Sequence, residues 1–91
     1  MLITNEYFDG KVKSIAFTNA EGKATAGVIS PGTYEFSTSS KERMVITSGI
    51  LEATVDGITK QYKSGEFFLV SEQTKFSVQA KEDCSYVCYY G

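Results

Sequence analysis

The most informative segment of the chain, residues 31–57, reads PGTYEFSTSSKERMVITSGILEATVDG. Within TYEFS, the aromatic side chains Tyr34 and Phe36 alternate with polar ones, which is the two-residue period of a half-buried strand. A polar break, STSSKE, precedes the β-branched and apolar run RMVITS. Gly49 then supplies a turn, and ILEATV alternates again until Asp56-Gly57, a dipeptide typical of tight hairpins. The segment predicts a strand, a loop, a strand, a turn and a third strand.

Similar patterns recur on both sides of this segment. Residues 1–10 are expected to form an N-terminal arm, with Tyr7 and Phe8 as apolar anchors. The run ITKQYK has the character of an edge strand, whereas the continuous apolar run EFFLV is typical of a strand buried on both faces. No helical period of useful length occurs, so the chain is expected to be an all-β sandwich or barrel. The further strands are expected at residues 11–17, 23–29, 58–63, 66–70, 75–80 and 85–90.

The size and charge of the chain limit its class of function. Its 91 residues are expected to form one domain, residues 1–91. A net charge of -2 argues against nucleic acid as a partner, because phosphate backbones are bound by basic surfaces. The apolar runs are far shorter than the roughly 20 residues of a membrane span, so no membrane association is expected. The N-terminus lacks the features of a signal peptide, and a cytoplasmic location is therefore expected.

The two cysteines, Cys84 and Cys88, lie on the same face of a predicted strand. Their Cα atoms would be about 13 Å apart in an extended chain, beyond the limit of roughly 7 Å for a disulfide. A zinc site would need further soft ligands nearby. We therefore expect two reduced thiols packed in the interior.

The complete absence of histidine excludes several kinds of chemistry. Nucleophilic catalysis by a Ser-His-Asp triad is impossible without it. A metal held by imidazoles is excluded too, and Glu35 with Glu42 would at most make a weak, oxygen-only site for a hard cation. The sequence also lacks a P-loop and a dinucleotide-binding glycine pattern.

The layout of residues 31–57 resembles the first motif of the cupin superfamily, whose members are small antiparallel β-barrels of the jelly-roll type. Glu42 and Gly49 match the glutamate and glycine of that motif, with six residues between them. The two histidine positions of the motif fall on Glu35 and Ser37. A second cupin motif is echoed by GEFFLVSEQTKF, in which Phe76 stands where histidine is usual. The resemblance thus keeps the frame of a cupin without its metal ligands.

Three separated blocks narrow this resemblance. NEYFDGKVKSI, PGTYEFST and CSYVCYY are similar, in order and spacing, to the small single-domain cupins called pyrimidine/purine nucleoside phosphorylases. The resemblance implies an all-β, cupin-type jelly-roll barrel. It also implies phosphorolysis of purine and pyrimidine nucleosides to free base and pentose 1-phosphate, with broad specificity and without a metal. Inorganic phosphate would be the co-substrate and no cofactor would be needed, and a homodimer is implied for small cupins of this kind.

Site residues can be suggested position by position within this frame. Glu42 is the expected catalytic residue, as a carboxylate that contacts the ribose or the base. The cupin frame implies that Glu35, Ser37, Glu42 and Phe76 point into the barrel. The remaining expectations concern substrate binding: Lys13 and Lys23 as strand-borne cations for phosphate, Ser37 with the adjacent Thr38 for phosphate or sugar hydroxyls, Glu35 as a further pocket residue, and Tyr34, Phe36, Phe76 and Tyr86 for base stacking.

Other readings stay open. The chain could be a non-catalytic module that binds a nucleoside or sugar in a cupin pocket after losing its metal site. It could also be a structural or interaction protein in which the aromatic side chains fill the barrel and leave no pocket. Lysines on strands are most often solvated surface charges, and aromatic residues on strands most often belong to the core.

Overall fold

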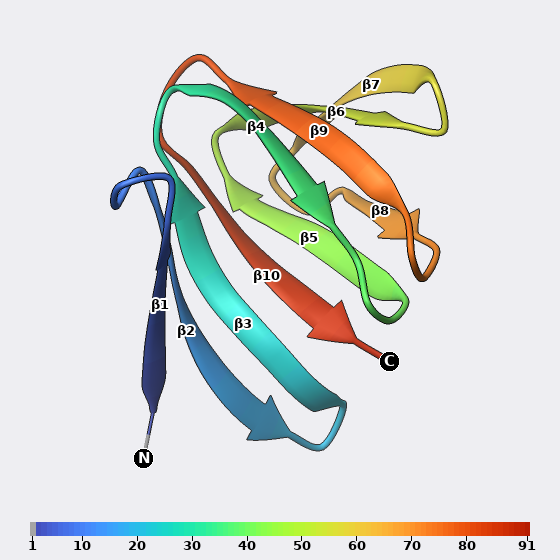
Figure 1. The fold of residues 1–91 in the computed structure, drawn as a ribbon. Helices are drawn as coiled ribbons and strands as arrows, with labels where there is room; N and C mark the ends of the chain where they lie inside the picture. The colour runs from blue at the N-terminus through green and yellow to red at the C-terminus, as the bar shows by residue number, and fades with distance from the viewer. Residues whose placement is uncertain (1) are drawn as a thin grey trace.

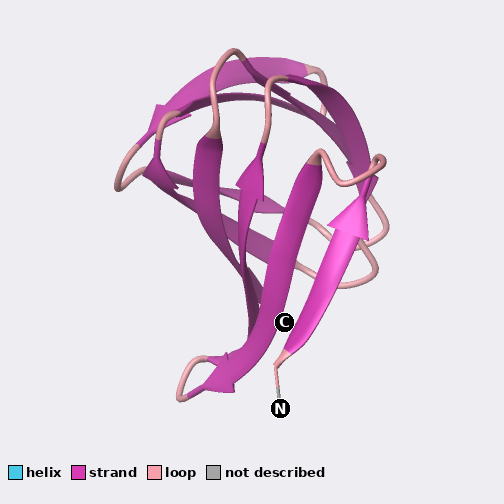
Figure 2. Cartoon of the chain, turned by 90° about the vertical axis from the view of Figure 1, so that its left-hand side faces the viewer, coloured by secondary structure: helices cyan, strands magenta, loops and turns pink. Residues whose placement is uncertain are grey.

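The computed structural model describes residues 2–91, and these form ten β-strands and no helix (Figures 1 and 2). Within the described residues no helix could cross a membrane. The strand bounds are close to those expected from the alternation of side chains. They are β1 (Ile3–Tyr7), β2 (Val12–Asn19), β3 (Gly22–Ile29), β4 (Gly32–Ser37), β5 (Glu42–Ser48), β6 (Ile50–Val55), β7 (Ile58–Lys63), β8 (Phe67–Val70), β9 (Lys75–Ala80) and β10 (Cys84–Tyr90).

The strands form two antiparallel sheets that face each other (Figure 1). The larger sheet has the order β1-β2-β3-β10-β5-β8, and the smaller has the order β4-β9-β6-β7. The sheets do not close into a continuous barrel, and the lower ends of β1, β2 and β3 extend beyond the smaller sheet. The expected all-β, jelly-roll class is confirmed.

The chain crosses between the sheets where the sequence predicted turns. Gly49 joins β5 of the larger sheet to β6 of the smaller one, with φ +78°. A Cβ atom at this position would lie 2.7 Å from the carbonyl oxygen of Asp83, so only glycine fits the crossing. On the other side, Tyr34 closes the turn between β3 and β4, because its hydroxyl donates to the carbonyl oxygens of Ser30 and Pro31 at 3.0 and 3.1 Å.

The hydrophobic core lies between the two sheets and contains apolar residues from both. Ile29 and Ile46 of the larger sheet and Leu51 of the smaller one are fully buried. Burying a side chain of this size stabilises the fold by about 1.5–3 kcal/mol relative to leaving it in water. Cys84 and Cys88 are free thiols buried in this core, as expected.

Two expectations about the sheet edges had different outcomes. β7, from ITKQYK, lies at an edge of the smaller sheet, as predicted. The expectation that EFFLV is buried on both faces is wrong, because β8 is the edge strand of the larger sheet and the side chains of Phe67 and Leu69 are 53% and 66% exposed. A continuous apolar run does not reveal whether a second sheet covers its outer face.

The segment expected to be an N-terminal arm takes part in the larger sheet. Met1 lies outside the described residues, and Ile3–Tyr7 form the edge strand β1, which pairs with β2. The turn between them contains Phe8, Asp9 and Gly10, all with positive φ. The Phe8 ring packs against Tyr34 and Phe36, with ring centroids 5.0 and 5.6 Å away, so Phe8 does act as an apolar anchor.

Candidate functional site

A pocket of about 270 Å³ opens between the two sheets. It therefore contradicts the reading in which aromatic side chains leave no space inside the fold. Its lining comes from β1, β2, β4, β5, β9 and β10 and from the loop after β4, and combines hydroxyl, carboxyl and thiol groups with aromatic rings. The lining residues are Tyr7, Ser14, Phe36, Ser37, Ser39, Glu42, Met44, Phe76, Tyr86, Cys88 and Tyr90.

Glu42 provides the acidic group of this pocket. It is the first residue of β5 and is half-buried, with Tyr90 opposite on β10 and Val70 opposite on β8. Burial raises the pKa of its carboxyl group above the ordinary value of 4.5, and a hydrogen bond from Cys88 offsets part of the rise. The Cys88 thiol donates to Oε1 of Glu42 at 3.4 Å. Glu42 is therefore a carboxyl group that keeps its proton to higher pH than an exposed glutamate.

β10 supplies three pocket residues from alternate positions on its inner face: Tyr86, Cys88 and Tyr90. Burial raises the pKa of Tyr86 to about 12 and that of Cys88 to about 12, so both side chains are protonated at neutral pH. Burial also raises the pKa of Tyr90, whose hydroxyl forms a 2.9 Å hydrogen bond with Thr25. This side of the pocket is polar, neutral and held in place by side-chain contacts.

The opposite side of the pocket is aromatic. Phe36 of β4 and Phe76 of β9 face each other across the ladder of the smaller sheet, and their rings stack with centroids 5.8 Å apart. Phe8 packs edge-on against Phe36, and Phe68 packs edge-on against Phe76 with centroids 6.1 Å apart. The two pocket rings are thus fixed by further rings behind them. Such a surface suits a flat, unsaturated ligand.

The structure brings several of the expected site residues together in this pocket. Glu42, Ser37, Phe36, Phe76 and Tyr86 all line it. Thr38, suggested as a partner of Ser37, does not line it. Its Oγ1 donates to the carbonyl oxygen of Ser71 at 2.6 Å and accepts from the Thr74 amide at 3.0 Å, so Thr38 fastens the loop after β4 to the turn before β9.

Two residues expected in the pocket from β4 lie elsewhere. Glu35 is exposed, and the expectation that it points into the barrel is wrong, because the two-residue period turns Tyr34 and Phe36 inward and Glu35 outward. Tyr34 points inward but is only 5% exposed and lies in the core, with its hydroxyl used in the turn between β3 and β4. Ser37 is exposed and reaches the pocket at its rim.

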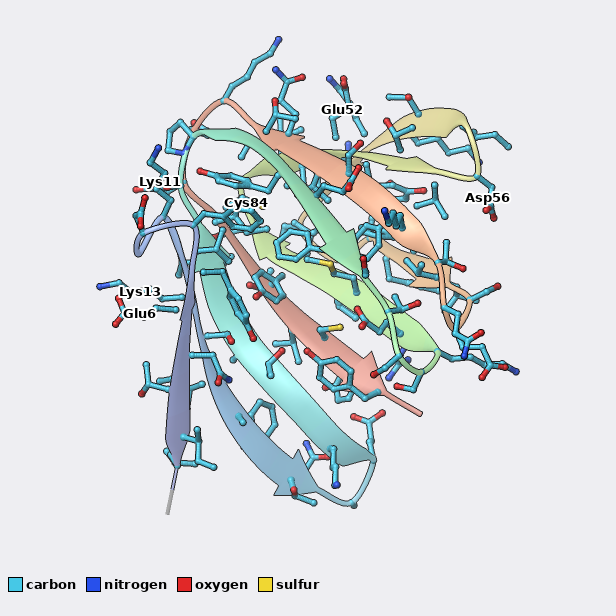
Figure 3. All side chains as sticks on the ribbon, in the orientation of Figure 1. Glu6, Lys11, Lys13, Glu52, Asp56 and Cys84 are labelled. Atoms are coloured by element: carbon cyan, nitrogen blue, oxygen red, sulfur yellow. The ribbon has the colours of Figure 1, made fainter. Side chains whose placement is uncertain are left out.

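The two expected cationic residues are not brought to the pocket either. Lys13 is exposed on the outer face of β2, where its Nζ lies 3.4 Å from Oε1 of Glu6, and Figure 3 shows both side chains pointing away from the interior. Lys23 lies at a separate hollow beside Ile3 and Phe17. No lysine or arginine is among the described residues that line the pocket. Arg43, next to Glu42, stacks over Tyr89 and pairs with Glu21, as expected of a residue on the outer face.

Several pocket residues were missed in the sequence. Cys88 and Tyr90 could have been found, because they follow Tyr86 at the two-residue spacing that places all three on one face. Ser14 could have been found in the same way, because it follows the buried Val12 at the two-residue spacing that places both on one face of β2. Met44 follows Glu42 at the same two-residue spacing and had this signal too. Tyr7 and Ser39 had none, since their approach to the pocket depends on how distant parts of the chain pack. The lining residues that were not expected from the sequence are Tyr7, Ser14, Ser39, Met44, Cys88 and Tyr90.

The described residues 2–91 contain no cluster of three or more cysteine, aspartate or glutamate side chains that could hold a metal ion. Glu35 and Glu42, considered above as a weak oxygen-only pair, are separated by the alternation of β4 and the position of the pocket.

Comparison with solved structures identifies the class of fold. A protein of unknown function from Vibrio parahaemolyticus superposes with a TM-score of 0.92 at 36% identity, over 97% of this chain and 96% of that one. An RmlC-like cupin from Shewanella frigidimarina superposes with a TM-score of 0.76 at 19% identity, over 91% of this chain and 78% of that one. The fold is that of a cupin.

Sequence comparison places the chain within that class. The model of the family described as pyrimidine/purine nucleoside phosphorylase matches residues 2–90. A relative of that name from Rhodopirellula baltica is 50% identical, with 94% of this chain and 96% of the relative covered. Another from Marinobacter nauticus is 47% identical over the full length of both chains. The chain belongs to the pyrimidine/purine nucleoside phosphorylase family, as its three sequence blocks indicated.

Proposed function

We propose that this protein is a pentosyltransferase that cleaves purine and pyrimidine nucleosides with inorganic phosphate, giving the free base and pentose 1-phosphate. Two relatives that match the chain over nearly its whole length are named pyrimidine/purine nucleoside phosphorylases, which supports this reaction class. The structural observation that supports it is the half-buried Glu42 carboxyl group in a pocket that also contains stacked aromatic rings.

Glu42 is the proposed catalytic residue. In phosphorolysis a phosphate oxygen bonds to the anomeric carbon of the pentose while the bond from that carbon to the base nitrogen breaks, and the base leaves with the electron pair. A proton delivered to the base makes it a better leaving group. A carboxyl group with a raised pKa keeps that proton to a higher pH than an exposed glutamate does, so we assign Glu42 to the base side of the substrate.

Broad base specificity follows from the kind of contacts proposed for the base. Phe36, Phe76 and Tyr86 would contact the face of the ring, and every nucleobase has such a face. Hydrogen bonds to the edge of one base would instead select for it. Purines and pyrimidines are therefore both expected as substrates.

Phosphate would be bound in this pocket without a lysine or arginine from the described lining. The available donors are the hydroxyl groups of Ser37 at the end of β4 and Ser39 in the loop after it, together with Ser14 deeper inside. Hydroxyl and backbone N–H groups can hold an anion without a formal positive charge. Weak affinity for phosphate is expected from such a site.

The reaction is proposed to need no metal and no organic cofactor. The sequence contains no histidine, so the usual metal ligands of cupins are missing. The test is to incubate uridine, inosine and adenosine with protein treated with a chelator, with and without phosphate, and to follow free base by chromatography. Base that appears only with phosphate supports the proposal, and activity that disappears with the chelator and returns with a divalent cation contradicts metal independence.

One observation favours a second candidate, a non-catalytic module that binds a nucleoside or sugar. The absence of a cationic side chain from the described pocket lining is unusual for an enzyme that uses phosphate as a co-substrate. This alternative predicts that nucleosides raise the melting temperature while no base is released with or without phosphate.

We further propose that the protein is a homodimer, with nucleosides and phosphate as its small-molecule partners. The two edge strands of the larger sheet expose apolar side chains: Leu69 on β8 is 66% exposed and Ile3 on β1 is 64% exposed. Exposed edges with apolar side chains favour pairing with another chain. Sedimentation at micromolar concentration that gives only a species near 10.0 kDa would contradict the dimer. The cytoplasmic location and the absence of a nucleic-acid partner stay predictions.

A further inference from the structure

Cys88 contacts Glu42 directly within the pocket. The side chain of Cys88 is 2% exposed, and its Sγ lies 3.4 Å from Oε1 of Glu42. Among the described residues, no other side chain is hydrogen-bonded to this carboxyl group. The two residues stand on neighbouring strands, where Cys88 pairs with Met44 and Tyr90 pairs with Glu42. The rigid ladder between β5 and β10 therefore fixes the position of the thiol relative to the carboxyl.

We propose that Cys88 is a positioning residue, which holds the Glu42 carboxyl group in one orientation and controls its protonation through the thiol hydrogen bond. The proposal rests on the proposed function in one respect: the proton of Glu42 has a role in catalysis only if the protein is a phosphorylase. The thiol cannot itself be a nucleophile at neutral pH, since only a thiolate attacks and this thiol is buried and protonated. It is a donor to the carboxyl oxygen instead.

The direction of the effect follows from the charge of the two partners. A donor stabilises the carboxylate more than the neutral acid, so the thiol lowers the pKa of Glu42 against the larger, opposite effect of burial. Removing the donor is expected to raise the pKa further. The other groups near Glu42 are the neutral hydroxyls of Tyr86 and Tyr90 on β10, Tyr7 from β1 across the pocket, the apolar Val70 on β8, and Lys41 and Arg43 next to Glu42 in the chain. None of these groups forms a hydrogen bond with the Glu42 carboxyl group, whereas the Cys88 thiol does.

The test is an NMR titration of the glutamate side-chain carboxyl carbons, with the Glu42 signal identified as the one that Glu42→Gln removes. Cys88→Ala is expected to move the inflection of this signal to higher pH, because the donor is lost. Cys88→Val is expected to do the same without opening space for water. Cys88→Ser restores a donor and is expected to return the inflection toward the wild-type pH. The matched control is Cys84→Ala, since Cys84 is also a buried free thiol but its Sγ donates to the carbonyl oxygen of Ser85 and not to Glu42.

This readout does not depend on catalysis. The proposal is overturned if Cys88→Ala and Cys88→Val titrate as the wild type does, or if Cys84→Ala moves the inflection as far as they do. If the protein is a phosphorylase, the pH dependence of kcat/KM is expected to move with the NMR inflection in the Cys88 variants. A moved NMR inflection in a protein without activity supports the role of Cys88 and contradicts the proposed function alone.

Discussion

Gly27 of β3 lies directly opposite Tyr86 of β10, and the Tyr86 ring occupies the space beside it. A Cβ atom on residue 27 would lie 2.7 Å from both Cζ and Oη of Tyr86 and 2.7 Å from the carbonyl oxygen of Lys13. The missing side chain of Gly27 therefore leaves room for the hydroxyl end of the Tyr86 ring, which also lies near Ser14. One wall of the pocket depends on this close approach.

Gly27→Ala is expected to destabilise the fold by about 1–3 kcal/mol, the usual cost of overpacking an interior. It is also expected to displace Tyr86 and to weaken nucleoside binding. Urea unfolding measures the first effect and a binding titration the second. In a Tyr86→Ala background the same substitution should cost less, because the ring is gone and only the contact with the Lys13 carbonyl oxygen remains. Equal costs in the two backgrounds would show that the ring does not restrict residue 27.

Local patterns predicted the strands because alternation in this chain is rarely interrupted. The turns at Gly49 and Asp56-Gly57 occur where these residues predicted them, and Gly49, Asp56 and Gly57 all have positive φ. The position of a strand within a sheet is not a local property. EFFLV forms an edge strand because β5 is the one strand that pairs with β8 among residues 2–91, and no pattern within EFFLV shows this.

The candidate site could be predicted only in part, because alternation shows which residues share a face of a strand but not which strands meet at the pocket. The choice of both Glu35 and Phe36 as pocket residues was inconsistent with a strand, because neighbouring side chains point to opposite faces. The period, applied strictly, would have kept Phe36 and removed Glu35, but it would also have removed Ser37, the last residue of β4, which reaches the rim of the pocket. In contrast, Tyr7 reaches the pocket because β1 pairs with β2 in a particular register, which depends on contacts that the sequence does not display.

Glu42→Gln is expected to lower kcat/KM for nucleoside phosphorolysis by about 100-fold or more, the usual contribution of a general acid. The amide keeps the shape of the side chain but has no acidic proton to give to the leaving base. Steady-state kinetics with inosine and uridine measure the effect. Glu35→Gln is the matched control, since Glu35 is exposed on the outer face of β4 and is expected to retain wild-type rates. Wild-type rates in Glu42→Gln would remove this residue from the mechanism.

The raised pKa of Glu42 also makes a prediction about stability. A carboxyl group whose pKa is higher in the folded than in the unfolded state favours folding while it is protonated, and that contribution is lost as the pH rises. The loss begins near the ordinary value of 4.5 and continues through the higher pKa of the folded protein. Glu42→Gln mimics the protonated acid, so its melting temperature is expected to exceed that of the wild type at neutral pH and to approach it below pH 4.5. A melting temperature of Glu42→Gln below that of the wild type at neutral pH would mean that burial does not raise the pKa of the Glu42 carboxyl group.

The lysine assignments lead to a simple kinetic test. Lys13→Ala is expected to leave the KM for phosphate unchanged, because Lys13 pairs with Glu6 on the outer face of the larger sheet. The pair is exposed, so its loss is expected to change the free energy of unfolding by less than about 1 kcal/mol. Initial rates at varied phosphate concentration decide the question. A raised KM for phosphate would return Lys13 to the site and would require a rearrangement of β1 and β2.

Tyr34 lies in the core and Tyr86 lines the pocket, so removing the hydroxyl group is expected to have different effects at the two positions. Tyr34→Phe removes the hydroxyl that donates to the Ser30 and Pro31 carbonyl oxygens, and is expected to cost about 1 kcal/mol of stability without changing KM for nucleosides. Tyr86→Phe keeps the stacking face and removes a hydroxyl that faces the pocket, so its effect is expected on nucleoside binding more than on unfolding. Chemical denaturation and kinetics on both variants test the assignment. If Tyr34→Phe raises KM while Tyr86→Phe does not, the substrate contacts the turn between β3 and β4 that the Tyr34 hydroxyl closes, and the pocket described above is not where the base binds.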